Sequence, residues 1–386
     1  MQTNTEYLDA ARAAARWIAT VPVADPSLYS GRAGIVVFYL ELSEATGDPT
    51  YRAAAEALGR ELLETIDDEQ AGLYDGVAGI GFALGELSTR VDARYRAALA
   101  RIAEVLRSRA RRVGRGRQWN DSADVFGGAA GIGLALVHAA RALGDPTLFD
   151  LAIDAGVGLI DGGHHRPAAM PNFSHGAAGV SYFLATLFRE TRDARFKVAA
   201  LAGAEHLIAI ADTRDEGCRI HHHEPGPGEH PLYYLGWCHG PVGVARLFYR
   251  LAQITGDTAW MEWVRRCARS IAASGIPERQ TPGLWNNVGQ CCGLAGIADF
   301  FFQLDTIGGY RDTEFAERLV RQVLTRAERI RTGLRWTQAE HRTRPGDLEA
   351  QAGYMQGAAG IGAMLLRADA CARGRAASIR FPDSPW

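Results

Sequence analysis

The chain has 386 residues, of which 47% are hydrophobic and 22% are charged, the composition of an ordinary protein with a large buried core. Its formal net charge of −2 creates no overall positive field, so we expect no nucleic-acid partner. The polar N-terminal segment MQTNTEYLDA lacks the pattern of a secretory signal, and no run of about 18 apolar residues predicts a membrane span. The sequence therefore indicates a cytoplasmic location, where thiols stay reduced.

A Gly-x-x-Gly element recurs seven times along the chain. Successive first glycines lie between 45 and 64 residues apart, which fits one helical hairpin per repeat. The seven elements begin at Gly31, Gly76, Gly128, Gly176, Gly240, Gly293 and Gly357.

Each element is followed by an apolar segment, such as residues 35–42 and 132–139. In five repeats an aspartate comes 13 or 14 residues after the second glycine, where it can cap a second helix: Asp48, Asp92, Asp145, Asp193 and Asp257. The segments after these caps, for example 51–66 and 95–109, are amphipathic. The repeating unit is therefore predicted to be an apolar inner helix, a turn and an amphipathic outer helix.

Seven such hairpins could form an open solenoid or close into a ring. Open solenoids usually end in polar capping repeats, whereas the first and last repeats here are as apolar as the others. We therefore expect an all-α protein, a double-layered α/α toroid of seven helical hairpins, with residues 1–386 forming one domain. Residues 107–117 carry six arginines, which we interpret as a solvated helix end.

The two residues before each first glycine occupy equivalent positions, which we call the slot. In a closed ring these positions should face a common centre at one height. The slot pairs are Tyr29-Ser30, Tyr74-Asp75, Phe126-Gly127, Ser174-His175, Cys238-His239, Cys291-Cys292 and Met355-Gln356. Three consecutive repeats thus carry cysteine or histidine where the others carry mostly bulky residues.

Cys238, Cys291 and Cys292 are the candidate metal ligands. Three thiolates with an open fourth position match a catalytic zinc site and favour zinc over magnesium or calcium. A substrate thiol in the fourth position would react as the thiolate near neutral pH. The sequence therefore predicts one Zn²⁺, while Cys267 and Cys371 are interpreted as core residues and Cys218 is left ambiguous.

Three further residues near the slot are candidates for proton transfer. His175 could take or give a proton near neutral pH, and Asp124 could orient a histidine or act as a base. His239 is a candidate either for proton transfer or as a hydrogen-bond donor to a zinc ligand. The histidine-rich stretch His221–His223 lies in the loop 212–236, which we interpret as a lid over the site and not as ligands.

These motifs resemble those of the lanthionine synthetase C-like family, and the resemblance covers nearly the whole chain. The Trp-Cys-His-Gly sequence at 237–240 and the Cys-Cys-Gly sequence at 291–293 look like its zinc motifs. The segments 124–131 and 174–179 look like its acid–base motifs. The resemblance implies an α/α toroid with Cys238, Cys291 and Cys292 as zinc ligands, and with Asp124 and His175 handling protons.

The resemblance also implies an activity and partners. Cyclases of this family add a cysteine thiolate to dehydroalanine or dehydrobutyrine in a precursor peptide, which forms a lanthionine or methyllanthionine thioether. Because the chain is too short for a fused dehydratase, a separate dehydratase or kinase/lyase enzyme would prepare the peptide. A peripheral membrane complex with an exporter is a further implied partner. Much of the family has histidine where this chain has Cys292, and some bacterial cyclases have tyrosine at the position of His239.

Two alternatives remain open from the sequence. The same residues would serve an enzyme that adds a free thiol, such as glutathione, to dehydrated proteins. A non-catalytic, zinc-stabilised scaffold that binds peptides is the other, although the presence of both Asp124 and His175 argues against it. A toroidal glycosidase is disfavoured, because such enzymes need paired carboxylates at the ring centre and this slot supplies only Asp75 and Asp124.

Overall fold

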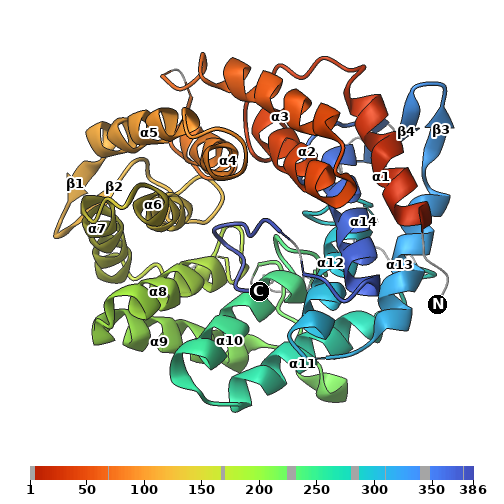
Figure 1. Cartoon of the computed structure of the whole chain (residues 1–386). Helices are drawn as coiled ribbons and strands as arrows, with labels where there is room; N and C mark the ends of the chain where they lie inside the picture. Colours follow the sequence, from red (N-terminus) through yellow and green to blue (C-terminus); the bar gives the residue numbers. More distant parts are fainter. Residues whose placement is uncertain are drawn as a thin grey trace.

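A computed structural model describes residues 5–67, 69–166, 170–223, 232–279, 287–308, 310–339, 348–376 and 378–386. Within these segments seven inner helices are arranged around a common centre, which we call the bore (Figure 1). Each inner helix follows one Gly-x-x-Gly element, as the sequence predicts. They are α2 (Arg32–Thr46), α4 (Val77–Arg90), α6 (Ala129–Leu143), α8 (Ala177–Thr191), α10 (Pro241–Thr255), α12 (Leu294–Thr306) and α14 (Ala358–Ala372).

An outer layer of helices covers the inner one. Six of the outer helices follow their inner partners in sequence: α3 (Pro49–Leu62), α5 (Tyr95–Arg109), α7 (Thr147–Asp161), α9 (Ala194–Ile210), α11 (Ala259–Ala272) and α13 (Thr313–Thr325). The last inner helix, α14, packs instead against α1 (Thr5–Ile18), the first helix of the chain. The two ends of the sequence therefore complete one hairpin together, and this closes the ring.

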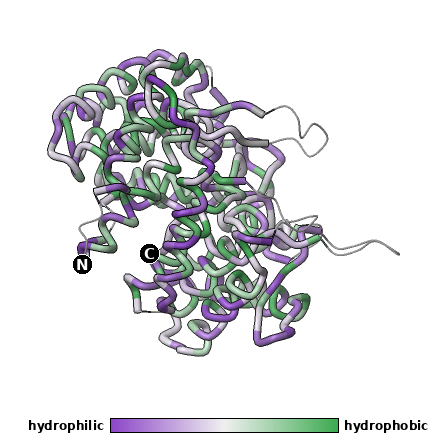
Figure 2. The backbone as a smooth tube through the Cα atoms, turned by 90° about the vertical axis from the view of Figure 1, so that its right-hand side faces the viewer, coloured by the Kyte–Doolittle hydropathy of each residue, from purple (hydrophilic) through white to green (hydrophobic). Residues whose placement is uncertain are grey.

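The two layers differ in burial as their sequences require. In α2 the ten consecutive residues Ala33 to Leu42 are buried, because this helix contacts neighbours on every side. In α3 the buried residues are Ala55, Gly59 and Leu62, which form one stripe facing inward. Figure 2 colours each residue by its hydropathy, so hydrophobic and hydrophilic residues can be located along the chain. None of the helices in the described segments is long and apolar enough to cross a bilayer.

The glycines bring neighbouring repeats into close contact where the inner helices begin. The first glycine of each element is the N-cap of its helix, and the second lies in the first turn. A β-carbon added at Gly34 would stand 2.6 Å from the β-carbon of Tyr354. One added at Gly243 would stand 2.5 Å from the β-carbon of Phe173. Larger residues at either position would therefore push adjacent repeats apart.

The predicted aspartate caps are confirmed. Asp48 and Asp193 are the N-caps of α3 and α9, and each accepts a hydrogen bond from the backbone N–H two residues later. Asp92, Asp145 and Asp257 accept the same bond just before their helices begin. The turn between inner and outer helix is thus fixed by one side-chain oxygen in each of five repeats.

Within the described segments, three short antiparallel hairpins and a 3-10 turn (Arg214–Glu216) interrupt the helical pattern. The hairpins are β1 (Arg111–Val113) with β2 (Gly116–Gln118), β3 (Glu328–Ile330) with β4 (Gly333–Arg335), and β5 (Thr337–Ala339) with β6 (Leu348–Ala350). The first hairpin contains much of the arginine-rich stretch that was expected to be only a helix end. Arg115 and Arg117 pair there with Asp161 and Asp154 of α7.

The chain ends inside the ring, in the bore between the inner helices (Figure 1). Asp383 in this tail is fully buried, accepts a hydrogen bond from the indole N–H of Trp237 and pairs with Arg246. Phe381 contacts Phe82 and Tyr354 through their rings. Residues 378–386, which we call the tail, therefore fill part of the bore by specific contacts.

Candidate metal centre and acid–base site

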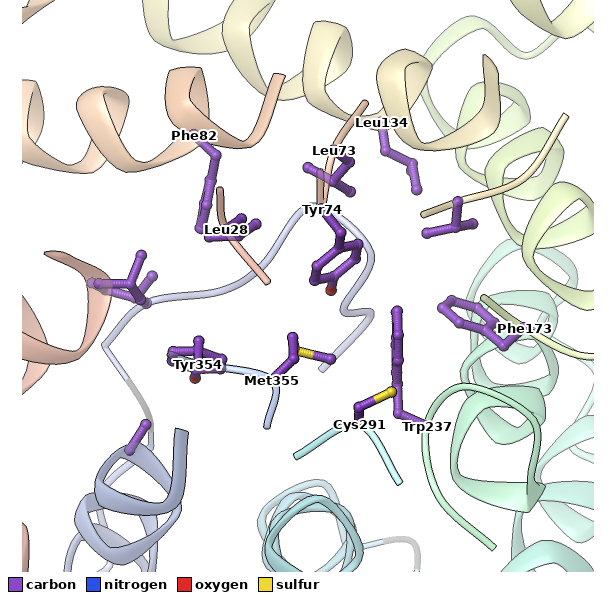
Figure 3. Packing of buried hydrophobic residues seen from close by; sticks show 14 of the residues in the cluster. Leu28, Leu73, Tyr74, Phe82, Leu134, Phe173, Trp237, Cys291, Tyr354 and Met355 are labelled. Atoms are coloured by element: carbon purple, nitrogen blue, oxygen red, sulfur yellow. The ribbon is translucent and has the colours of Figure 1, made fainter. Parts of the chain in front are cut away.

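The slot residues form one closed ring of backbone hydrogen bonds. In every repeat, the residue two positions before the first glycine donates its N–H to the carbonyl of its equivalent in the next repeat. The seven bonds measure 2.8–3.4 Å and run Tyr29, Tyr74, Phe126, Ser174, Cys238, Cys291, Met355 and back to Tyr29. The predicted common height of the slot is therefore confirmed. Figure 3 shows Tyr74, Trp237, Met355 and Cys291 around the centre of this layer.

The structure brings the three predicted ligands together. The sulfurs of Cys238, Cys291 and Cys292 all lie within 4.8 Å of one another. Cys238 Sγ is 2.9 Å and Cys291 Sγ 3.3 Å from Cys292 Sγ, well beyond a disulfide bond of about 2.05 Å. Two sulfurs on a tetrahedral zinc stand about 3.8 Å apart, so small side-chain rotations would open this cluster around an ion. The donor set therefore fits one zinc ion.

Protonation within the cluster is uneven. Burial raises the pKa of Cys238 well above its usual range, and its contacts with the other two thiols add to this. Burial also acts to raise the pKa of Cys291, but hydrogen bonds from Cys238, Cys292 and Tyr29 outweigh it and lower that pKa. The cluster thus favours one thiolate when it is empty, and a divalent cation would stabilise the others.

Of the remaining cysteines, Cys267 is fully buried in α11, as a core residue should be. Cys371 is only half-buried in α14. Cys218, left ambiguous by the sequence, is buried within hydrogen-bond reach of Cys267. None of the six cysteines, all of which lie in described segments, forms a disulfide.

Asp124 and His175 contact each other beside the slot layer. His175 Nδ1 lies 2.8 Å from Asp124 Oδ2, while Asp124 Oδ1 accepts the backbone N–H groups of Gly127 and Gly128. Burial acts to raise the pKa of Asp124, but these hydrogen bonds, His175 first, lower it overall. Asp124 is therefore a carboxylate that can orient the imidazole through Nδ1 and direct Nε2 to proton transfer.

His239 lies among other imidazoles. Its ring stacks on that of His222 at 4.3 Å and lies 5.7 Å from that of His175. Burial, followed by the charges of His222 and His175, lowers the pKa of His239 to about 3. It is therefore neutral near pH 7 and is a poor proton donor there.

Residues 212–236 are the predicted lid, of which residues 224–231 lie outside the described residues. Its two flanks pair with each other, since the N–H of His222 donates to the carbonyl of Leu232. The Nδ1 atoms of His222 and His223 are 3.1 Å apart. Through the stacking of His222 on His239, the base of this segment borders the site.

Sequence reasoning did not assign roles to two residues that border the site. Tyr29 accepts a hydrogen bond from Gln356 Nε2 at 2.7 Å and hydrogen-bonds the thiol of Cys291. Asp75 is half-buried, and its Oδ1 has no hydrogen-bond partner among the described residues. Both are slot residues, so the alignment of the slot was the signal that could have found them.

Asp75 should give the protein a distinct pH dependence of stability. Burial, followed by the nearby charge of Asp124, raises its pKa from 3.8 to about 6. The folded state then binds more protons than the unfolded state between these values, so the free energy of unfolding falls as pH rises from about 4 to about 6. We expect Asp75→Asn to flatten this fall and to be more stable than the wild type above pH 6.

Urea unfolding of both proteins across this pH range would measure the difference. Glu41, whose pKa burial raises to about 7, contributes to the pH dependence of both proteins, so their difference reports Asp75 alone. Parallel stability curves for wild type and variant would rule out a raised pKa at Asp75.

Comparisons with known proteins agree with this architecture. A family model described as lanthionine synthetase C-like protein matches residues 22–373. Among solved structures, nisin cyclase superposes with a TM-score of 0.71 at 15% identity, over 95% of this chain and 94% of that chain. An unsaturated glucuronyl hydrolase specific for heparin superposes with a TM-score of 0.53 at 12% identity, over 96% and 98%. A search of curated protein sequences finds no match.

At these identities the structural matches show the fold alone, the α/α toroid that the sequence predicts. The family model, by contrast, spans most of the chain, including the three cysteines, Asp124 and His175. The chain belongs to the lanthionine synthetase C-like family.

Proposed function

We propose that this protein is a zinc-dependent cyclase that joins a cysteine thiol of a precursor peptide to a dehydroalanine or dehydrobutyrine of the same peptide. The observation that carries the proposal is the cluster of three cysteine sulfurs within 4.8 Å, on the same ring layer as His175, which contacts Asp124. A thiol-binding metal and an oriented proton carrier are the two components that thioether formation requires.

Cys238, Cys291 and Cys292 would hold the zinc. Cys238 and Cys291 are nearly fully buried, whereas Cys292 is partly exposed. When bound, zinc would lower the pKa of a peptide thiol so that it reacts as a thiolate near pH 7. The partial exposure of Cys292 leaves its side of the cluster accessible to the peptide.

His175 would carry the proton. The thiol sulfur bonds to the β-carbon of the dehydrated residue, and the electron pair of the carbon–carbon double bond shifts toward the α-carbon and its carbonyl. His175 Nε2 would take the thiol proton and return it to the α-carbon, which leaves the peptide mass unchanged. The carboxylate of Asp124, 2.8 Å from Nδ1, would stabilise the charged imidazole between the two transfers.

A dehydrated, cysteine-containing peptide would test the reaction. We expect its free thiols to disappear without a change in mass. A mass gain of one glutathione, when that thiol is supplied, would identify instead the enzyme that adds free thiols. Tight peptide binding with no thiol loss would identify the non-catalytic scaffold. In the proposed setting, a separate dehydratase or kinase/lyase enzyme supplies the peptide, and an exporter at the membrane receives it.

Cys292→His should slow cyclisation while zinc stays bound. A neutral imidazole in place of the third thiolate removes one negative charge from the site, which lowers the reactivity of the incoming thiolate. We expect a rate loss of about tenfold and fewer thioethers at unintended positions of the peptide. Zinc content, cyclisation rate and ring position, measured by mass spectrometry, check this expectation. An unchanged rate at full zinc occupancy would contradict it.

A further inference from the structure

The ring has a polar cavity at the end of the bore opposite the cysteines. It has a volume of about 290 Å³ and is lined by the C-terminal halves of α4, α6, α8 and α10 together with the tail. The slot layer lies where these helices begin, so the helix length separates the cavity from the candidate zinc site. The cavity therefore needs an explanation of its own.

Arg250 of α10 lines this cavity and carries a buried charge. The residue is only 2% exposed, and its guanidinium donates to Gln253 Oε1 and to the hydroxyl of Tyr182, both uncharged. Its Nε has no hydrogen-bond partner, and no carboxylate of the described residues forms an ion pair with it. A buried guanidinium without a counter-ion is costly, because neither water nor an opposite charge stabilises it.

The surroundings add positive charge. Arg189 also lines the cavity, and burial, followed by the charge of Arg250, lowers its pKa. Arg141 and Arg189 share the single carboxylate of Glu190. His138 is partly exposed, and desolvation lowers its pKa although Glu86, which also lines the cavity, lies 3.8 Å away and acts to raise it, so His138 stays neutral near pH 7. The cavity therefore has more guanidinium groups than the carboxylates that face them.

Helix ends explain some of these arginines but not all. Arg90, Arg141 and Arg189 lie in the last turns of α4, α6 and α8, where a cation offsets the helix dipole. Arg250 lies before the last turn of α10, so the dipole does not explain its burial. Arg380, an exposed residue of the tail, also lines the cavity and adds a further positive charge there.

We propose that this cavity binds a phosphate group, held by Arg250 and Arg189 from the wall of the bore and by Arg380 from the tail. Guanidinium groups bind phosphate oxygens in paired, charge-assisted hydrogen bonds. A dianion neutralises more of the uncompensated charge than one carboxylate does. Because the tail supplies part of the site, the bound group also links the end of the chain to the inner helices.

Calorimetric titration of the full chain with inorganic phosphate and with pyrophosphate tests the proposal, with acetate at matched ionic strength for comparison. We expect one site per chain that prefers the phosphates to acetate. Arg250→Gln should weaken binding by about tenfold or more, and Arg380→Gln by a smaller factor. Arg101→Gln, which alters an exposed arginine paired with Asp67 on the outer surface, should bind as the wild type does.

Arg380→Gln keeps the proposal testable if Arg250→Gln fails to fold, because Arg380 is exposed. Equal affinity for acetate, or undiminished binding in both variants, would overturn the proposal. The titration is repeated after zinc chelation, and binding should persist. Phosphate binding should therefore be the same whether or not the protein is a cyclase, so failure of one proposal can be distinguished from failure of the other.

Discussion

Cys291→Ala should abolish both zinc binding and thioether formation. Cys291 is 3% exposed and contacts the sulfur of Cys292, so no other described cysteine stands where it could replace its ligand atom. Two remaining thiolates cannot complete a catalytic zinc site, which needs three protein ligands. Loss of the metal removes several kcal/mol of stabilisation from the reaction, about a thousandfold in rate or more.

A matched control uses a cysteine outside the cluster. Cys371 lies half-buried in α14, near Asp305, and Cys371→Ala should keep one zinc per chain and the wild-type rate. Metal analysis and thiol counting on both variants, after circular dichroism has verified their fold, make the comparison. Full zinc content in Cys291→Ala would refute the ligand assignment, whatever the activity of that variant.

His175→Asn should retain zinc but lose most of the activity. The variant keeps a polar side chain at the site but removes the group that transfers protons near neutral pH. Removal of a general acid–base residue typically lowers a rate by about 10²–10⁴. Asp124→Asn should lower the rate as well, since an amide does not stabilise the charged imidazole.

The expected signature distinguishes proton transfer from a structural role. The wild-type rate should depend on pH, because an acid–base group takes up and returns a proton in the reaction, and the residual rate of His175→Asn should have lost that dependence. His206→Asn, a substitution of an exposed histidine on α9, serves as the control and should leave the profile unchanged. Full activity of His175→Asn at neutral pH would refute the acid–base assignment.

Most of the ring could be predicted from the sequence because each repeat carries the same local signals. A glycine N-cap and an apolar run recur in every repeat, and an aspartate follows 13 or 14 residues after the second glycine in five of them. The pairing of α1 with α14 could not be read this way. It joins the two ends of the chain, and no local pattern encodes a contact between segments so far apart.

The tail escaped prediction for a similar reason. Residues 378–386 belong to no repeat, and their place in the bore depends on single contacts, such as that of Asp383 with Trp237 and Arg246. The short hairpins were also missed. In the arginine-rich stretch, the turn at Gly114, with a positive φ of 58°, reverses the chain and pairs β1 with β2.

The site was predictable to the extent that the slot alignment sets its height. It grouped the three cysteines with His175, and their sulfurs do meet within 4.8 Å. The alignment did not predict the contact between Asp124 and His175. Asp124 lies outside the slot, and its distance from His175 depends on how the loop before Gly128 folds. The stacking of His222 on His239 also depends on how the segment 212–236 folds back, which local sequence does not determine.

The central claim is that the three thiols hold a zinc ion which activates a peptide thiol. The most direct test measures two quantities on one sample. Zinc per chain is measured together with the rate at which a dehydrated, cysteine-containing peptide loses thiols, before chelation, after it and after zinc is restored. We expect one zinc per chain, thiol loss without a mass change, loss of this activity on chelation and its return with zinc. Equal rates with and without zinc would contradict the account.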